Sequence, residues 1–509
     1  MRLNLAAALA TLLAGLVLLA GNDRTGWSNG YGYDGRIYGD LAEHFPGAVF
    51  GNEGVTPPGI GRFTGERPKG IDAYYVRRIL PSAVVYYTMT GLGIEKTRHN
   101  VVVTFGVWNA VIIALVAFLW GLIADRFGLS RAAKLLGLFA LVINFGVLKS
   151  SFYYPVLTDT FAFGFGAASL YFWLNRNTLG LVAATILGSF TWPTELVLGT
   201  ILIMFPPGTV PLGRSPLAWS GESRRATGLK VAAAAIPALA LAAYVIQLRA
   251  TDYHAPEEIP LGGAFALSVL AAAAIVFAAL LWLVPDIGRK QLRALGQAVV
   301  SWRVALGAGT FAAILAGQAL IAERPGAYDD LGLLKSSIWY SALNPGLFLI
   351  VLVGFFGPIL ALAIVQWPAI CRAFHTWGIG ATLVAVFFVA SCLLTESRKL
   401  IVLYPFMVFF VVIACERIAE RRWFLPIFLA GSLVASRVWL PIGEFPLKTS
   451  ETLTHFPAQK FFLSSGIWTS FDLYLVQAAA LAALIAAFAA LRPHSHGIEP
   501  PSAVPSPSS

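Results

Sequence analysis

The stretch YGYDGRIYGDLAEHF (31–45) contains the residue types of this sequence that are best suited to acid–base chemistry. It combines the carboxylates Asp34 and Asp40 with Tyr38, a candidate substrate contact. On a helix, Asp34 lies near the start, where the partial positive charge of the N-terminus favours a carboxylate. Such a group can take the proton from an attacking hydroxyl, so Asp34 and Asp40 are candidate catalytic residues. The alternative role of Asp34 is a simple N-cap, which is compatible with the first because a cap holds the carboxylate rigidly.

A second cluster is basic and aromatic. The stretch DAYYVRRILP (72–81) places Arg77 and Arg78 side by side among tyrosines, close to a predicted membrane surface. The planar fork of arginine matches the oxygens of a phosphate group. We therefore expect these residues to bind a lipid phosphate, and the alternative is a general contact with anionic lipid headgroups.

A third cluster lies far along the chain, in TESRKLIVLYP (395–405). It places Glu396, Arg398 and Lys399 in a short turn between two apolar runs. Charges so near hydrocarbon are costly unless they are paired or used. Arg398 and Lys399 are therefore candidate substrate-binding residues, and the alternative is an ion pair with Glu396 that only tethers the turn.

Three isolated ionisable residues stand at the edges of apolar runs. Lys149 and Asp159 are candidate substrate contacts. Glu195 ends the interruption TWPTE (191–195), which predicts two short helices that meet at a bend because proline disfavours a continuous helix. Irregular backbone at membrane depth is tolerated where it is buried or lines a cavity, so Glu195 is a further catalytic candidate. Its weaker alternative is the N-cap of the following helix.

The elements that position these residues are predicted to be membrane helices. The chain has 509 residues, of which 57% are hydrophobic and 12% charged, about half the charge of a soluble domain. Its apolar runs are continuous over about 17–25 residues, without the alternation of a barrel. This composition excludes a water-soluble globule and predicts an all-α polytopic membrane protein with about fourteen spans. The runs are 3–20, 101–123, 135–148, 159–174, 180–190, 195–206, 231–248, 263–284, 304–322, 347–367, 379–394, 401–415, 423–440 and 472–491.

The loops predict orientation. The net charge is +10, and the basic residues concentrate in loops that share a side with the N-terminus, as cytoplasmic loops do. We therefore expect both termini in the cytoplasm and the long loop 21–100, with its interfacial helices, outside. The positive charge marks these loops and predicts no nucleic-acid partner.

The chain divides into a membrane module, residues 1–206, which carries the loop 21–100, and a second membrane module, residues 207–491. A Pro/Ser-rich tail, 492–509, is predicted to be disordered and cytoplasmic. The first run (3–20) is interpreted as a retained span, and a cleaved signal peptide is the alternative.

Metal ligands are not evident. The three cysteines, Cys371, Cys392 and Cys415, lie in or beside apolar runs without metal-ligand spacing and are interpreted as packing residues. Asp34 and Asp40 are six residues apart and do not form a D-x-D pair. We predict no cofactor, with a divalent metal as the open alternative.

Taken in order, these motifs resemble the GT-C superfamily of polytopic glycosyltransferases. YDGRIYGDLA followed by AYYVRRILP is similar to the YDG-x-x-Y … Y-R-x-x-R-I-L-x-P arrangement of bacterial members, and ESRKLIVLYPFMV to their distal E-x-R-x-x-x-x-x-P segment. YYPVLTDTFAFGFGAASLYFWL and TWPTELVLGTIL are similar to later spans of the family. The resemblance covers roughly residues 1–205 and, more loosely, the last spans.

The resemblance implies an inverting transfer of a sugar from a polyprenyl-phosphate donor to a hydroxyl of a saccharide or lipid-linked acceptor. The enzyme would lie in the bacterial inner membrane with its active site facing the periplasm. By motif position, Asp34 would be the general base, and Arg77 or Arg78 would hold the donor phosphate together with Arg398. Trp192 departs from the family, because many relatives carry an arginine there.

Other functions are alternatives. A transporter or a flippase of lipid-linked oligosaccharides would suit the number of spans, but such proteins concentrate ionisable residues near the midplane of the bilayer, often in repeated halves. A polysaccharide polymerase or ligase would also use arginines, with its main loop expected late in the chain. A non-catalytic scaffold would leave the aspartate and arginine clusters unexplained.

Overall fold

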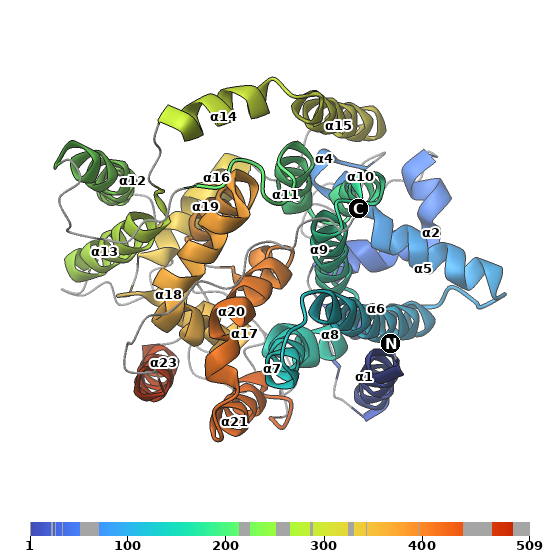
Figure 1. Ribbon diagram of the computed structural model, residues 1–509. Helices are drawn as coiled ribbons and strands as arrows, with labels where there is room; N and C mark the ends of the chain where they lie inside the picture. The colour runs from blue at the N-terminus through green and yellow to red at the C-terminus, as the bar shows by residue number, and fades with distance from the viewer. Residues whose placement is uncertain are drawn as a thin grey trace.

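The computed structural model describes most of the chain as helices packed side by side (Figure 1). No β-strand occurs among the residues that it describes. Seven helices are long and apolar enough to cross a membrane, or eight if a bent pair is counted as one span. The chain is therefore a polytopic all-α membrane protein. The described residues are 2–21, 24–25, 27–32, 34–50, 71–212, 224–250, 265–285, 289–323, 330–342, 344–394, 396–440 and 471–491.

The long apolar helices lie throughout the chain. They are α1 (Arg2–Gly21), α6 (Arg98–Arg126), α12 (Arg224–Ala250), α13 (Phe265–Leu283), α15 (Trp302–Ile321), α18 (Pro358–Trp377) and α23 (Phe471–Ala490). The bent pair is α7 (Arg131–Val142) followed by η2 (Phe145–Lys149) and α8 (Ser150–Tyr153), with a bend of 53°. The shorter apolar helices are α10 (Thr178–Ser189), α11 (Pro193–Met204), α17 (Leu347–Phe356), α19 (Ile379–Cys392) and α21 (Phe424–Ser436).

The predicted count of about fourteen spans is not confirmed, because several apolar runs form short or broken helices. The run 347–367 was predicted to form one span, but it contains two helices. The first, α17, ends at Phe356, and the second, α18, begins at Pro358. Between them, Gly357 has a φ of 79°, which other residues rarely adopt. Pro358 also lacks the N–H that would continue the helical hydrogen bonds. A glycine–proline pair therefore breaks an uninterrupted apolar run.

The interruption TWPTE separates α10 from α11, so the prediction of two short helices is confirmed. Pro193 is the first residue of α11, where its missing N–H costs nothing. The two helices pack closely as an antiparallel pair. A Cβ added to Gly199 would lie 2.1 Å from Oγ1 of Thr185, so the approach requires glycine at this position.

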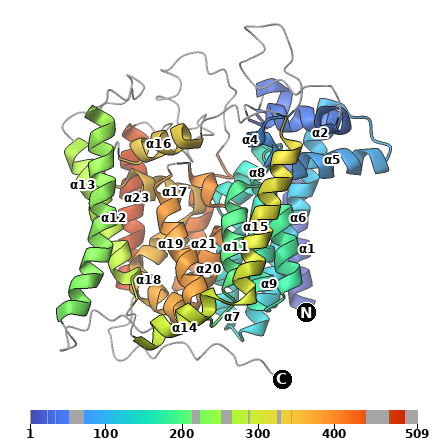
Figure 2. The ribbon, with the colours of Figure 1, turned by 90° about the horizontal axis from the view of Figure 1, so that it is seen from above.

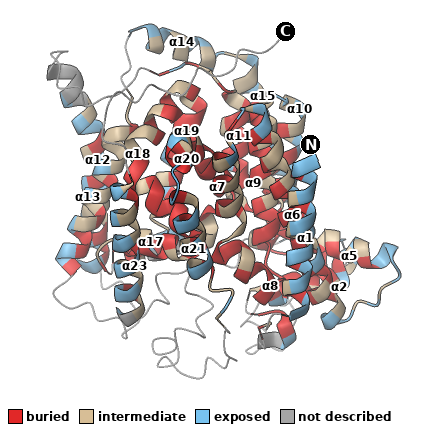
Figure 3. Ribbon diagram, turned by 60° about the horizontal axis from the view of Figure 1, so that its bottom comes forward, coloured by how far each residue is buried: buried red, intermediate tan, exposed pale blue. Residues whose placement is uncertain are grey.

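Two largely buried helices lie in the centre of the bundle. These are α9 (Asp159–Leu174) and α20 (Tyr404–Ala419), and Figure 3 shows them covered on their sides by the other spans. The outer helices α12, α13 and α23 carry many exposed apolar side chains, as expected where lipid is the solvent.

The bundle has two distinct ends, which the pairing of α1 with α6 defines. Asn4 at the start of α1 donates a hydrogen bond from Nδ2 to Oδ2 of Asp125, 2.7 Å away near the end of α6. The other end of α6 begins with Arg98, whose Nε is 4.0 Å from Oε1 of Glu43. Glu43 belongs to α2 (Gly35–Phe50), which lies beyond the spans at that end (Figure 2). We call these the Asp125 end and the α2 end.

The long first loop builds the α2 end. The predicted interfacial segment forms α4 (Ala73–Val76) and α5 (Ile79–Gly91), while residues 51–70 lie outside the described part. Ser82 on α5 donates a hydrogen bond to the carbonyl of Tyr38, 2.8 Å away, and fixes α2 against α5. The helix α16 (Asp330–Ser341) lies at the same end, as Figure 2 shows.

At the Asp125 end, α14 (Arg289–Val299) lies across the ends of the spans (Figure 2). The remaining short elements are η1 (Trp27–Gly30) and η3 (Ser397–Leu400). The predicted tail 492–509 lies outside the described residues, so its expected disorder stays a prediction.

Candidate active site

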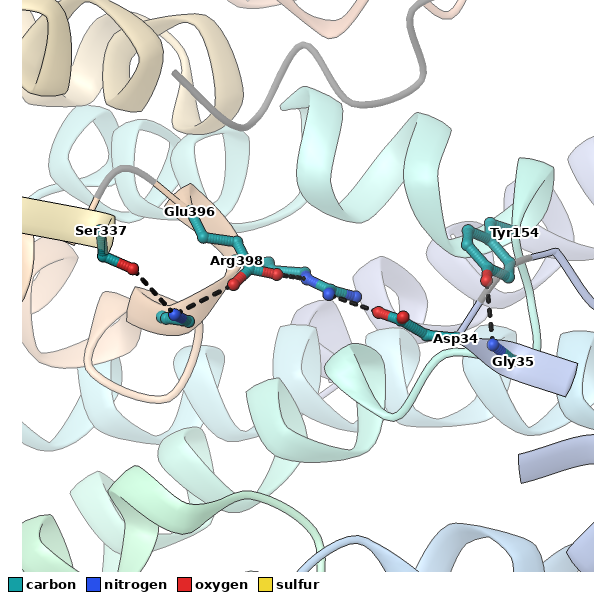
Figure 4. Close-up of polar contacts among 7 residues, drawn as sticks. Asp34, Gly35, Tyr154, Ser337, Glu396 and Arg398 are labelled. Atoms are coloured by element: carbon teal, nitrogen blue, oxygen red, sulfur yellow. Dashed lines mark hydrogen bonds and ion pairs between the residues drawn. The ribbon is translucent and has the colours of Figure 1, made fainter. Parts of the chain in front are cut away.

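The two most distant motifs of the sequence meet at the α2 end. Asp34 lies directly before α2 and Arg398 lies in η3, 364 residues later, yet Oδ2 of Asp34 is 2.5 Å from Nη2 of Arg398 (Figure 4). Their side chains are 32% and 22% exposed, so the pair is accessible from outside the bundle. This ion pair joins the first external loop to the distal turn.

The pair continues into a chain of charges. Nε of Arg398 donates to Oε1 of Glu396 at 2.5 Å, and Nζ of Lys399 donates to Oε2 of Glu396 at 3.1 Å. Burial alone would raise the pKa of Glu396, but Arg398 and Lys399 outweigh it and hold this pKa well below its usual range. The predicted ion pairs that tether the turn are confirmed, and Arg398 additionally reaches Asp34.

Asp34 is positioned by a close approach of backbone to a tyrosine ring. The N–H of Gly35 donates to the hydroxyl of Tyr154 at 2.9 Å, which holds the first residue of α2. Gly32 has a φ of 70°, and a Cβ there would lie 2.1 Å from the Tyr154 ring. Among the described residues, the Asp34 carboxylate bonds with Arg398 and with no backbone N–H of α2. Asp34 is thus directed into the cluster, and the simple N-cap role is not the one observed.

Arg78 is held between two aromatic rings. Its guanidinium carbon lies 4.0 Å from the ring centre of Tyr74 and 5.0 Å from that of Trp192. Its Nη1 also donates to the carbonyl of Tyr74 at 3.2 Å. Arg78 is within electrostatic range of Arg398, so both cations face one region. Arg77 is the C-cap of α4 and is partly buried.

Tyr38 and Asp159 complete the cluster. Burial raises the pKa of Tyr38 well above its usual value, so the hydroxyl stays neutral beside Arg78 and Asp34. Asp159 is the first residue of α9, is 6% exposed and lies within electrostatic range of Arg398 and Asp34. Its Oδ2 is buried without a hydrogen-bond partner among the described residues. An uncompensated buried carboxylate oxygen is costly, and a bound ligand, ion or water would satisfy it.

Asp40 and Glu195 do not join this cluster. The charges that act most strongly on Asp40 are those of Glu43, Arg98 and Arg36, so Asp40 belongs to a different face of α2. Burial, reinforced by Glu43, raises the pKa of Asp40. Lys149 is 1% exposed at the end of η2, inside the bent helix pair.

Glu195 is buried within the bundle, apart from the cluster. Its Oε1 accepts a hydrogen bond of 2.5 Å from Oγ of Ser169. Ser169 follows Asp159 by ten residues on α9, which corresponds to about 15 Å along the helix axis. The alternative that Glu195 caps α11 is wrong, because α11 begins at Pro193 with Trp192 as its N-cap.

Sequence reasoning missed two positioning residues. Trp192 stands where an arginine is common in the resembled family, and the structure places it against Arg78. Tyr154 holds Gly35 through its hydroxyl. The only sequence feature that points to Tyr154 is its position directly before Pro155, where proline favours the end of a helix. The described part of the chain contains no group of three or more His, Cys, Asp or Glu side chains suited to a metal ion.

The fold and the cluster define a polytopic membrane protein with an accessible charged site at one end of its spans. No protein-family model, curated protein or solved structure matches the chain. What the chain does is therefore inferred from the geometry of the cluster.

Proposed function

We propose that this protein is a membrane glycosyltransferase that moves a sugar from a polyprenyl-phosphate donor to an acceptor hydroxyl, with inversion. The observation that supports this function best is the Asp34–Arg398 pair, which joins a carboxylate and a phosphate-binding side chain from opposite parts of the sequence. The acceptor is a saccharide or a lipid-linked molecule.

In this proposal, Asp34 is the general base. It takes the proton of the acceptor hydroxyl while the hydroxyl oxygen forms a bond to the anomeric carbon of the sugar. The bond between that carbon and the phosphate oxygen breaks, and its electron pair leaves with the polyprenyl phosphate. The leaving phosphate is a weak base, so the step needs no strong acid.

The donor phosphate is held by Arg398 and Arg78. Arg398 uses Nε and Nη2 for Glu396 and Asp34, which leaves its Nη1 edge to bind phosphate oxygens. Arg78 is pre-oriented by its two aromatic neighbours and adds a second cation. Such fixed donors stabilise the charge that develops on the leaving phosphate.

The proposed orientation in the membrane depends on which end of the bundle faces the cytoplasm. The charge pattern of the loops supports a cytoplasmic Asp125 end and an α2 end that faces the periplasm of a bacterial cell. A periplasmic active site has no pool of nucleotide sugars, which favours a lipid-linked donor.

A flippase or other transporter is the second candidate, and it is favoured by the bent pair α7–α8 together with the buried carboxylate of Glu195. Broken helices and buried charges within spans are typical of transport pathways. A polymerase or ligase of lipid-linked polysaccharide would use the same cluster and would differ in its acceptor.

The test is transfer of a labelled sugar from polyprenyl-phosphate donors in membranes, comparing wild type with Asp34→Asn and Asp40→Asn at matched expression. We expect Asp34→Asn to lose about a hundredfold or more of the transfer rate because the base is lost. Asp40→Asn, which changes a carboxylate of α2 six residues after Asp34 and outside the cluster, should retain transfer. Equal transfer by wild type and Asp34→Asn would contradict the assignment of the base.

A further inference from the structure

The helix α14 is strongly amphipathic. It has 11 residues, with the sequence RKQLRALGQAV. At about 3.6 residues per turn, the cations Arg289, Lys290 and Arg293 lie within one face. Leu292 and Val299 lie on the opposite face, together with Leu295. The helix therefore separates a positively charged face, in its first five residues, from an apolar face.

The described part of the chain leaves most of the apolar face uncovered, and Leu295 is partly buried. None of the residues of α14 is buried, and Leu292 and Val299 are 56% and 50% exposed. Val300, which directly follows the helix, is 85% exposed, and Trp302, the first residue of α15, is 64% exposed. A short helix that exposes so much apolar surface needs a partner outside the bundle.

The position of α14 identifies that partner. The next helix, α15, begins at the Asp125 end. Nη1 of its Arg303 donates to Oγ1 of Thr178 at 3.1 Å. Thr178 lies three residues after Asn175, whose side chain bonds with Arg126, the neighbour of Asp125. Figure 2 shows α14 across the ends of the spans at this end. A helix in this orientation, with Trp302 beside it, lies where headgroups and acyl chains meet.

We propose that α14 is a lipid-binding helix that lies in the membrane interface at the Asp125 end and recognises anionic phospholipid headgroups. Leu292, Leu295 and Val299 enter the upper acyl region, and the three cations bind headgroup phosphates. The charge of the helix complements an anionic surface, since it carries no carboxylate of its own. This site is independent of the glycosyltransferase proposal and lies at the opposite end of the protein.

The experiment uses the full chain in lipid nanodiscs with an environment-sensitive dye on a single introduced cysteine. The native cysteines are buried, so the introduced thiol is labelled selectively. Leu292→Cys reports the apolar face and Gln297→Cys the polar face. We expect the dye at 292 to be shielded from aqueous iodide in discs with phosphatidylglycerol and less so in pure phosphatidylcholine, while the dye at 297 stays accessible. If Leu292→Cys does not fold, Val299→Cys reports the same face.

The role of charge is tested by Arg293→Gln in the same assay. Loss of one cation near an anionic surface should weaken the association about fivefold. Arg422→Gln, which removes an arginine from the turn after α20, is the matched control and should leave the dye signal unchanged. Equal accessibility of both faces in both disc types would overturn the proposal. If shielding of the dye at 292 depended on protein concentration and not on phosphatidylglycerol, the proposal would be wrong. The apolar face would then bind a second copy of the chain.

Discussion

At the scale of single residues, the site depends on two arginines that are held in different ways. Arg398 is fixed by carboxylates, whereas Arg78 is fixed by the rings of Tyr74 and Trp192. An arginine held by rings keeps its positive charge available to a ligand, because none of the carboxylates in the described part of the chain forms an ion pair with it. This difference predicts that the two residues contribute differently to donor binding.

Replacing Arg78 by lysine tests this prediction. Lysine keeps the charge but loses the planar fork and the stacking, so KM for the donor should rise about tenfold with little change in kcat. Arg77→Lys is the matched control at the neighbouring position and should have a small effect. The measurement is steady-state transfer over a range of donor concentrations. Equal increases in KM for both variants would contradict the assignment of Arg78 as the phosphate ligand.

The residue types identified most members of this site, whereas only the resemblance implied that Asp34, Arg398 and Arg77 or Arg78 act together. Asp34, Tyr38, Arg78, Asp159 and Arg398 were predicted from residue type and position next to apolar runs. Their proximity depends on packing between segments hundreds of residues apart, which no local pattern encodes. Asp40 and Glu195 were proposed as catalytic residues for the same reason as Asp34, namely a carboxylate near an apolar run. The sequence does not show whether such a carboxylate faces a site or a neighbouring helix.

At the scale of elements, the turn at η3 is held by Glu396. It bonds with both Arg398 and Lys399, and its side chain is 26% exposed. Replacing it by glutamine leaves two cations close together without their shared counter-charge. The turn should then loosen, and Arg398 should lose its fixed position relative to Asp34.

The variant Glu396→Gln should therefore lower the free energy of unfolding by about 2 kcal/mol at neutral pH. A carboxyl pKa that is lowered by folding stabilises the protein above the unfolded pKa, and this contribution is lost as the pH falls through the lowered folded pKa. The difference between wild type and variant should stay constant between about pH 6 and pH 8 and shrink below about pH 4. Thermal unfolding in detergent across this range measures it, and a difference that disappears between pH 8 and pH 6 would refute the ion-pair explanation.

The helix boundaries were predicted correctly where a proline was taken as a break, and wrongly where a glycine–proline pair was overlooked. The interruption TWPTE gave two helices as expected. The run 347–367 was expected to be one span although Gly357 and Pro358 lie within it, and a glycine–proline pair is a recognised break signal. Hydrophobicity alone therefore overestimates the continuity of helices in this chain.

At the scale of the whole molecule, the protein has two chemically different ends. The α2 end holds the charged cluster, and the Asp125 end holds the basic amphipathic helix α14. The composition and apolar runs were sufficient to predict a polytopic helical protein. The number of spans was not predictable in this way, because short helices inside the bundle are as apolar as helices that cross the membrane.

The central claim is that Asp34 catalyses sugar transfer from a lipid donor at the α2 end. The most direct test is release of polyprenyl phosphate by the purified protein in vesicles of known orientation, with the donor and a mixture of acceptors present only on one side. We expect release when the donor is in the leaflet that faces the α2 end, and loss of release in Asp34→Asn. Release only from the leaflet at the Asp125 end, or equal release by Asp34→Asn, would contradict it.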